Sequence, residues 1–310
     1  MAHHLADVVA RCAQRLREAG IEDAQEQALA LVAFAADIST SQARVGIVTG
    51  TQVSDAVAEA VEELTVRRQR REPLQYIVGR APFRYRDLAV GPGVFVPRPE
   101  TEVVAQVAID ALARIDGPGG RRDLSLQGSP HTPHAGPLVV DLCSGSGAIA
   151  LSVVTEVAHT RVVAVEREAE AFAWLERNAA ELTSEQRERL TLVRGDVTDD
   201  TLLADLEGRV DVVVSNPPYV PQHEAPVQPE AQHDPNAALY GGDEDGLRVP
   251  RAVMATARRL LMPGGLFVME HSSSQGSAAV EAIESLGAFA DAVTMPDLAG
   301  LDRVLVARRT

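Results

Sequence analysis

Residues 138–150 read Leu138-Val-Val-Asp-Leu-Cys-Ser-Gly-Ser-Gly-Ala-Ile-Ala150. The apolar run at the start of this stretch is typical of a buried strand. Gly145 and Gly147 then form a turn that leads into a helix. A glycine turn between a strand and a helix lets backbone N–H groups approach a ligand at the helix N-terminus. The stretch therefore predicts the first strand of an open α/β sheet with a nucleoside-type ligand at its carboxyl edge.

The chain after Pro137 continues to alternate between strand and helix patterns. Strands are expected at residues 138–142, 161–166, 190–194, 210–215, 266–270, 290–294 and 303–307, and helices at 148–158, 168–182, 202–206, 246–261 and 278–286. Such alternation predicts a mostly parallel, Rossmann-like sheet with helices on both faces.

Residues 1–72 predict a smaller helical domain. Apolar residues recur with helical spacing from Leu5 to Leu16, and Cys12 falls on that apolar face as a core residue. Two further helices are expected in this domain, at 24–36 and 54–70.

Residues 73–99 predict a β-hairpin linker, built from β-rich runs at 74–79 and 83–90 with turn residues between them. The second domain then comprises residues 100–310, and its first helix is expected from Thr101 to residue 115. Residues 116–137, rich in Gly, Pro, Ser and His, predict a surface connection. His131 and His134 have metal-like spacing there, but a solvated loop is favoured and no metal is expected.

Composition limits the compartment and the partners. The 310 residues are 45% hydrophobic, with no apolar run long enough to span a bilayer. The two cysteines, Cys12 and Cys143, make no disulfide framework, so a cytoplasmic location is expected. The formal net charge of −15, with no lysine among 29 basic residues, argues against direct binding to nucleic acid.

Polar residues follow three further strands of the predicted sheet. Glu166 ends the second strand, Asp196-Val197 follows the third, and Asn216-Pro217-Pro218-Tyr219 closes the fourth. The two prolines cannot donate ladder hydrogen bonds, so the backbone must leave the sheet at Asn216. The Asn216 amide offers an acceptor and a donor that suit a planar amide or amino group. Taken alone, the four residues could equally be a Pro-Pro turn with a capping Asn.

The nature of the nucleoside ligand is left open by the glycine turn. Gly145-x-Gly147-x-x-Ala150 also satisfies the dinucleotide pattern, and an acid at position 166 suits the ribose of either a nicotinamide or an adenosylmethionine cofactor. A nicotinamide oxidoreductase is therefore one alternative, but it leaves Asn216-Pro-Pro-Tyr219 without a role. Cys143 lies inside the turn and is interpreted as a small packing residue, because no base is suggested near it.

Three other stretches produce a resemblance to a known family. Val96-Pro-Arg-Pro-Glu-Thr-Glu102, Ser215-Asn-Pro-Pro-Tyr219 and Ala238-Leu-Tyr-Gly-Gly242 resemble the HemK/PrmC-type release factor glutamine methyltransferases. The resemblance runs from about Leu74 to the C-terminus, through Pro263-Gly-Gly265, Glu270-His271 and Asp297-Leu-Ala-Gly300. Cys143 stands where that family often carries Gly, Glu166 where Asp is common, and Val197 where some relatives are bulkier.

The resemblance implies a class I methyltransferase that uses S-adenosylmethionine and releases S-adenosylhomocysteine. Its substrate would be the glutamine side chain in the Gly-Gly-Gln loop of peptide chain release factors. The helical domain at residues 1–72 would recognise that substrate, and the protein would be a monomer. The expected catalytic residues are Asn216, Pro217 and Tyr219, and the substrate contacts are Asn216, Pro217, Pro218 and Tyr219. The expected cofactor contacts are Asp141, Cys143, Ser144, Gly145, Ser146, Gly147, Glu166, Asp196, Val197 and Asn216.

An adenine-N6 nucleic-acid methyltransferase is the second alternative, because the Asn-Pro-Pro-Tyr motif is shared with enzymes of that type. The acidic charge and the lack of a recognisable nucleic-acid-binding module count against it. No histidine base is expected in either reaction, and His223, His233 and His271 are interpreted as structural or solvated.

Overall fold

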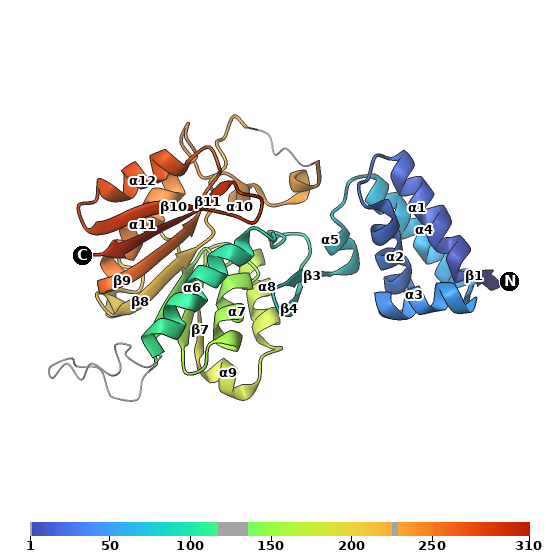
Figure 1. Cartoon of the computed structure of the whole chain (residues 1–310), viewed down its shortest axis with the longest axis horizontal. Helices are drawn as coiled ribbons and strands as arrows, with labels where there is room; N and C mark the ends of the chain where they lie inside the picture. The colour runs from blue at the N-terminus through green and yellow to red at the C-terminus, as the bar shows by residue number, and fades with distance from the viewer. Residues whose placement is uncertain (1, 117–135, 225–228) are drawn as a thin grey trace. The chain divides into compact units, whose positions relative to one another are not determined.

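The computed structural model describes residues 2–116, 136–224 and 229–310. The connection expected at 116–137, including His131 and His134, lies outside these residues except at its ends. The described chain forms two compact units (Figure 1). The first unit contains residues 2–80, 90–92 and 229–233. The second unit contains the remaining described residues.

The first unit is a small helical bundle. Its elements are β1 (Ala2–His4), α1 (Leu5–Glu18), α2 (Ala24–Ala35), α3 (Thr40–Thr49), β2 (Gln52–Ser54), α4 (Asp55–Gln69), α5 (Leu74–Val78) and the 3₁₀ turn η2 (Pro229–His233). Leu5, Cys12 and Leu16 on α1 are buried as predicted, in one apolar core with Leu31 and Val32 of α2. The unit is therefore held together by a single hydrophobic cluster.

Two elements of this unit differ from the sequence prediction. Helix α3 was not expected; a capping box at Ser39 and Gln42 starts it, and Gly50 in the left-handed region ends it. The run 74–79, expected to be extended, instead forms α5 between Pro73 and Gly79. Tyr76 and Ile77 are buried, so burial decides the conformation there and overrides the β propensity of the run.

The second unit contains a seven-stranded sheet with strand order β10-β11-β9-β8-β5-β6-β7. The strands are β5 (Leu138–Leu142), β6 (Arg161–Glu166), β7 (Leu190–Arg194), β8 (Val210–Ser215), β9 (Leu261–Glu270), β10 (Phe289–Pro296) and β11 (Asp302–Arg309). Pairing is parallel from β7 to β9, and β11 runs antiparallel to both of its neighbours. The expected mostly parallel sheet is confirmed, and the chain order reverses at β5, between β6 and β8.

Helices cover both faces of the sheet (Figure 1). The helical elements of this unit are α6 (Thr101–Asp116), α7 (Ala148–Glu156), α8 (Ala169–Ala179), α9 (Ser184–Glu188), η1 (Ala204–Leu206), α10 (Asn236–Leu239), α11 (Arg248–Leu260) and α12 (Gly276–Glu284). Side chains alternate between faces along each strand, so Val139 enters one apolar core with α6, α7 and α8 while Val140 enters the other with α11 and α12. Both faces are buried, which explains the continuous apolar runs of the strands.

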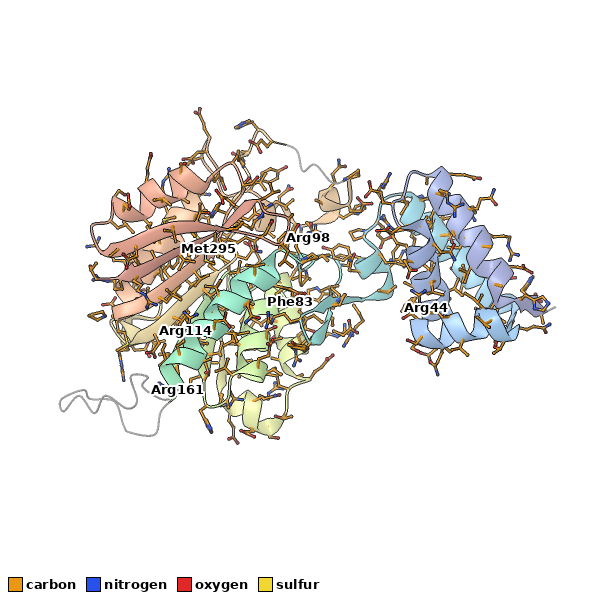
Figure 2. The ribbon with its side chains drawn as sticks, in the orientation of Figure 1. Arg44, Phe83, Arg98, Arg114, Arg161 and Met295 are labelled. Atoms are coloured by element: carbon orange, nitrogen blue, oxygen red, sulfur yellow. The ribbon has the colours of Figure 1, made fainter. Side chains whose placement is uncertain are left out.

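A β-hairpin precedes the sheet, as expected, but both its strands lie between residues 80 and 89. Strand β3 (Arg80–Phe83) pairs with β4 (Arg86–Ala89). Phe83 (labelled in Figure 2) is fully buried in the core that α6 covers, and Arg84 in the turn forms an ion pair with Glu156 of α7. In the part of the chain that the structure describes, no helix has the length and apolarity needed to cross a membrane.

Candidate active site

A cavity of about 390 Å³ lies in the second unit and is lined by residues from the carboxyl ends of β5, β6, β7 and β8. This edge is where open α/β sheets bind ligands, at the point where the strand order reverses. Nearly all residues expected at the site line this cavity: Asp141, Cys143, Ser144, Gly145, Ser146, Glu166, Asp196, Val197, Asn216, Pro217, Pro218 and Tyr219. Gly147 does not line it. The structure thus brings four separate strand ends to one cavity.

Gly147 has a backbone role instead. Its φ of +89° lies in the left-handed region, and a Cβ atom there would approach Leu175 Cδ1 to 2.6 Å. Any larger residue would therefore strain the turn and displace the packing of α8 against it. Cys143, at the start of the same turn, also has a positive φ of +62°, the conformation that glycine adopts most readily.

Glu166 connects the glycine turn to the second strand. Its Oε2 atom accepts a hydrogen bond from the Gly145 backbone N–H at 2.8 Å, and its Oε1 atom accepts one from Glu168 N–H at 2.8 Å. Burial raises the pKa of this carboxyl, although the backbone donors act to lower it. Each oxygen retains a second acceptor position, so Glu166 can also accept from the hydroxyl groups of a ribose.

Asp141 is buried at the end of β5 with one oxygen lacking a partner. Its Oδ2 accepts from the Ala150 N–H at 3.1 Å, while Oδ1 has no hydrogen-bond partner. Burial raises the pKa of Asp141 to about 7. An orphaned carboxylate oxygen at a cavity wall is satisfied when a ligand donates to it.

The charged lining of the cavity is mostly acidic. Among the described residues that line it, Asp141, Glu166, Glu168, Glu170 and Asp196 contribute carboxylates, and Arg167 contributes the one guanidinium. A sulfonium and an ammonium group, as in S-adenosylmethionine, suit such a lining, whereas the pyrophosphate of a dinucleotide would meet like charge. The acidic lining therefore fits the expected cofactor better than it fits NAD(P).

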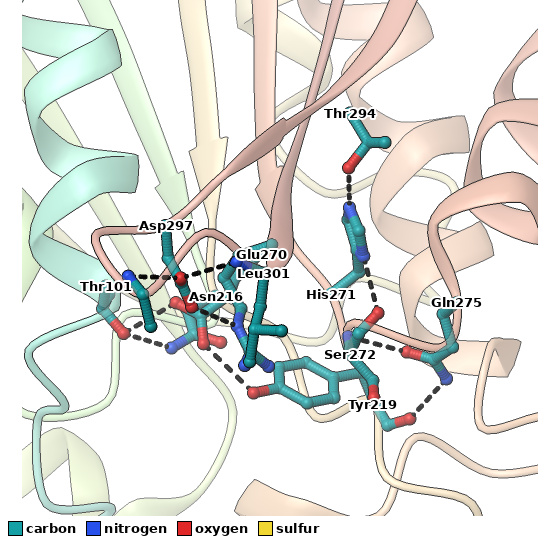
Figure 3. Close-up of polar contacts among 12 residues, drawn as sticks. Thr101, Asn216, Tyr219, Glu270, His271, Ser272, Gln275, Thr294, Asp297 and Leu301 are labelled. Carbon is teal, nitrogen blue, oxygen red and sulfur yellow. Dashed lines mark hydrogen bonds and ion pairs between the residues drawn. The ribbon is translucent and has the colours of Figure 1, made fainter.

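Asn216 and Tyr219 belong to a partly buried hydrogen-bond network (Figure 3). Asn216 Nδ2 donates to Thr101 Oγ1 at 3.0 Å, and Thr101 Oγ1 donates to Glu270 Oε2 at 2.7 Å. The Tyr219 hydroxyl donates to Glu270 Oε1 at 3.1 Å. The Gln275 side chain also holds the segment 216–219, because its Nε2 donates to the Tyr219 carbonyl at 2.7 Å. Asn216 is thus anchored from outside the loop, which is more than a capping residue requires.

The segment Phe95–Pro99 forms another side of the cavity through Phe95 and Pro97. Thr101, at the start of α6, lines the cavity next to this segment. Arg98 (Figure 2) forms an ion pair with Asp234 at 2.6 Å, and its guanidinium lies 5.0 Å from the Phe95 ring centroid. The Arg98 contacts fix this segment beside the residues that follow Asp234, which also line the cavity.

Sequence reasoning missed Thr101 and Glu270 as site residues. Thr101 begins α6 as expected, and its hydroxyl contacts Glu270 and Asn216. Both residues lie in stretches that carried the family resemblance, which was the available signal. None of His223, His233 and His271 lines the cavity, and the buried His271 ring contacts Ser272 and Thr294.

Family models match two parts of the chain: "Methyltransferase small domain" at residues 129–232 and "PrmC N-terminal domain" at residues 7–79. The fold and the cavity accordingly define a class I methyltransferase. The release factor glutamine methyltransferase of Bifidobacterium longum is 43% identical, over 98% of this chain and 99% of its own length. This chain belongs to that family.

A second relative carries the same name. The release factor glutamine methyltransferase of Streptomyces coelicolor is 42% identical, over 97% of this chain and 96% of its own length. Among solved structures, a methyltransferase from Pyrococcus furiosus covers 72% of this chain and 88% of its own, with a TM-score of 0.46 and 16% identity.

Proposed function

We propose that this protein methylates the side-chain amide nitrogen of the glutamine in the Gly-Gly-Gln motif of peptide chain release factors. The methyl donor is S-adenosylmethionine. The observation that carries the proposal is the anchored amide of Asn216, which lines the same cavity as Glu166, in a chain 43% identical to a release factor glutamine methyltransferase.

The cofactor half of the cavity is assigned to the glycine turn and the two following strand ends. Glu166 would hold the ribose hydroxyls, and Asp196 and Val197 the adenine. The orphaned Oδ1 of Asp141 would accept from the ammonium group or a bridging water. When bound, S-adenosylmethionine supplies an electrophilic methyl group on a sulfonium centre.

The substrate half is assigned to residues 216–219. An amide nitrogen is a poor nucleophile because its lone pair is delocalised into the carbonyl. Asn216 Oδ1 and the Pro217 carbonyl would accept its two N–H groups and thereby orient it. Such orientation contributes up to roughly 7–11 kcal/mol in well-aligned systems. The same oxygens would stabilise positive charge as it develops on nitrogen, and the Tyr219 ring would stack on the amide plane. As the N–CH3 bond forms, the S–CH3 bond breaks and S-adenosylhomocysteine leaves. The methylated nitrogen, made acidic by its positive charge, then loses one N–H proton to water.

The adenine-N6 alternative is not favoured. The full-length relatives are named release factor glutamine methyltransferases, and the net charge of −15 opposes tracking along a phosphate backbone. We also propose that the helical unit, which matches the PrmC N-terminal model, recognises the release factor. We further propose that the protein is a monomer, acts in the cytoplasm and makes no direct contact with nucleic acid. The two free cysteines are consistent with that compartment.

Mass spectrometry tests the proposed reaction. Purified protein is incubated with S-adenosylmethionine and a release factor, and the Gly-Gly-Gln peptide is sequenced. The expected result is a gain of one CH2 on the glutamine side chain. A parallel incubation with DNA and RNA should give no methyladenine, and methylation of nucleic acid alone would reject the proposal.

A further inference from the structure

The orientation of the Asn216 amide decides what it can bind. A side-chain amide presents either an oxygen acceptor or an NH2 donor, and the two ends have nearly the same shape. Only the oxygen can accept an N–H group from a substrate amide. In the structure Nδ2 of Asn216 points to Thr101 Oγ1, at 3.0 Å, which places Oδ1 at the other end of the amide group.

The hydrogen bond between Thr101 and Glu270 determines which end of the Asn216 amide faces Thr101. A threonine hydroxyl has one proton to donate and two lone pairs that accept. The Thr101 proton is committed to Glu270 Oε2 at 2.7 Å, and an ionised carboxylate accepts only. The Thr101 hydroxyl can therefore only accept a hydrogen bond from Asn216, and only the NH2 end of the Asn216 amide can donate one. While Glu270 is ionised, the bonds run in a single direction, from Asn216 through Thr101 to Glu270.

Glu270 also secures the second substrate-facing side chain. Its other oxygen accepts from the Tyr219 hydroxyl at 3.1 Å, so one carboxylate at the end of β9 holds both Tyr219 and, through Thr101, Asn216 (Figure 3). The charged groups that face Glu270 are Arg303 on β11, which favours the carboxylate, and Glu100 before α6, which opposes it. Arg303 is held in turn by Asp297 at 3.3 Å.

We infer that Thr101 and Glu270 are positioning residues that fix the Asn216 amide with its oxygen toward the substrate and hold the Tyr219 ring in place. The inference rests on the proposed amide methylation. Neither residue needs to touch the substrate. Their effect is to exclude the flipped amide, in which an NH2 group would face the substrate N–H.

The first test compares Thr101→Val with Thr101→Ser. Valine keeps the shape of threonine but has no hydroxyl, whereas serine keeps the hydroxyl. Thr101→Val should lower kcat for release-factor methylation by roughly 10- to 100-fold, the loss typical of a displaced reacting geometry. Its S-adenosylmethionine affinity and melting temperature should stay close to wild type, and Thr101→Ser should restore most of kcat. Wild-type kcat in a folded Thr101→Val would overturn the inference.

The second test uses Glu270→Gln and does not depend on the folding of Thr101→Val. Burial raises the pKa of Glu270 to about 7, although hydrogen bonds from Thr101 and Tyr219 and the charge of Arg303 act to lower it. A protonated Glu270 can donate to Thr101 and reverse the direction of the bonds. Wild-type kcat should therefore rise as pH increases through about 7. Glutamine does not titrate, so this step should vanish in Glu270→Gln; an unchanged step would refute the role of Glu270.

A third readout does not require turnover. The Asn216 side-chain NH2 group, assigned by its loss in Asn216→Ala, is followed by NMR hydrogen exchange. One of its protons should be protected in the wild type and in Thr101→Ser, and unprotected in Thr101→Val. Equal protection in all three would overturn the inference. If the wild type does not methylate release factors at all, the proposed function fails while this measurement still decides the orientation.

Discussion

The Glu166 carboxylate accepts a hydrogen bond from the Gly145 backbone N–H at 2.8 Å, which joins the end of β6 to the glycine turn after β5. One side chain thus shapes the turn and lines the cavity. Because Glu168 N–H donates to the other oxygen, the carboxylate cannot rotate away without losing two backbone partners. The acid at this strand end therefore has a structural role, and it lines the cavity in which we propose that the cofactor binds.

Glu166→Ala should weaken S-adenosylmethionine binding by roughly 10- to 100-fold, since hydrogen bonds to a charged group contribute about 1.5–3 kcal/mol. Isothermal titration calorimetry measures this affinity directly. Asp200→Asn is the matched control, because Asp200 is exposed beyond β7 and does not line the cavity. Equal affinities of the two variants for S-adenosylmethionine would show that Glu166 does not contribute to cofactor binding.

Asn216→Ala should abolish methylation of the release factor and leave S-adenosylmethionine affinity largely intact. The variant loses the oxygen that orients the substrate amide, while Glu166 and Asp196 keep their positions. Product is measured by mass spectrometry and affinity by calorimetry on the same preparation. Full activity in this variant would disprove the assigned mechanism.

Asn178→Ala should destabilise the protein. Asn178 is 1% exposed; its Oδ1 accepts from Ala89 N–H, and its Nδ2 donates to the carbonyls of Ala89 and Ser146. Truncation leaves buried backbone groups unpaired, at about 1–3 kcal/mol each. Denaturant unfolding measures the loss of free energy of unfolding.

Glu176→Ala on the same helix serves as the control for Asn178, because Glu176 is exposed and should change stability by less than about 0.5 kcal/mol. A similarly small effect at Asn178 would show that water replaces all three of its hydrogen bonds.

Glu270 should make stability depend on pH. Its pKa rises from an ordinary value of about 4.3 in the unfolded chain to about 7 in the folded protein. The folded state holds the proton more tightly, so the contribution to stability is full below the unfolded pKa and is lost as pH rises through 7. Glu270→Gln lacks this loss. Its free energy of unfolding relative to wild type should increase from pH 5 to pH 8; a constant difference would contradict the shift.

Neither cysteine should react with iodoacetamide in the folded protein at pH 7.5. Burial raises the pKa of both the Cys12 and the Cys143 thiol, and only the thiolate is nucleophilic. Intact-mass measurement should show no adduct until denaturant is added, and two afterwards. Rapid labelling of native protein at Cys143 would mean that this thiol is ionised.

Much of the second unit could be read from local sequence. The strands are apolar runs buried on both faces. The turn after β5 needs a positive φ at Gly145 and Gly147, and the glycines at these positions predict it. Pro217 and Pro218 mark where β8 must end. These signals depend on neighbouring residues only. The succession of strands along the chain and the four strand ends that line the cavity could therefore be predicted, whereas the spatial order of the strands was not predicted.

Local sequence was a poor guide where distant contacts compete with propensity. The β-rich run at 74–79 became α5 because Tyr76 and Ile77 are buried in the helical unit. Helix α3 carries only two buried residues, Ala43 and Gly46, and therefore shows little amphipathic pattern.

The sequence by itself determined that Asn216 ends a strand at the ligand-binding edge, because proline stops the ladder and strand ends of a parallel sheet share one edge. Only the tertiary structure decided which way the Asn216 amide faces. That choice depends on Thr101, 115 positions earlier, whose own partner Glu270 is 169 positions away from it. No local pattern encodes a hydrogen bond between such distant side chains; it exists only once α6, β8 and β9 have packed together.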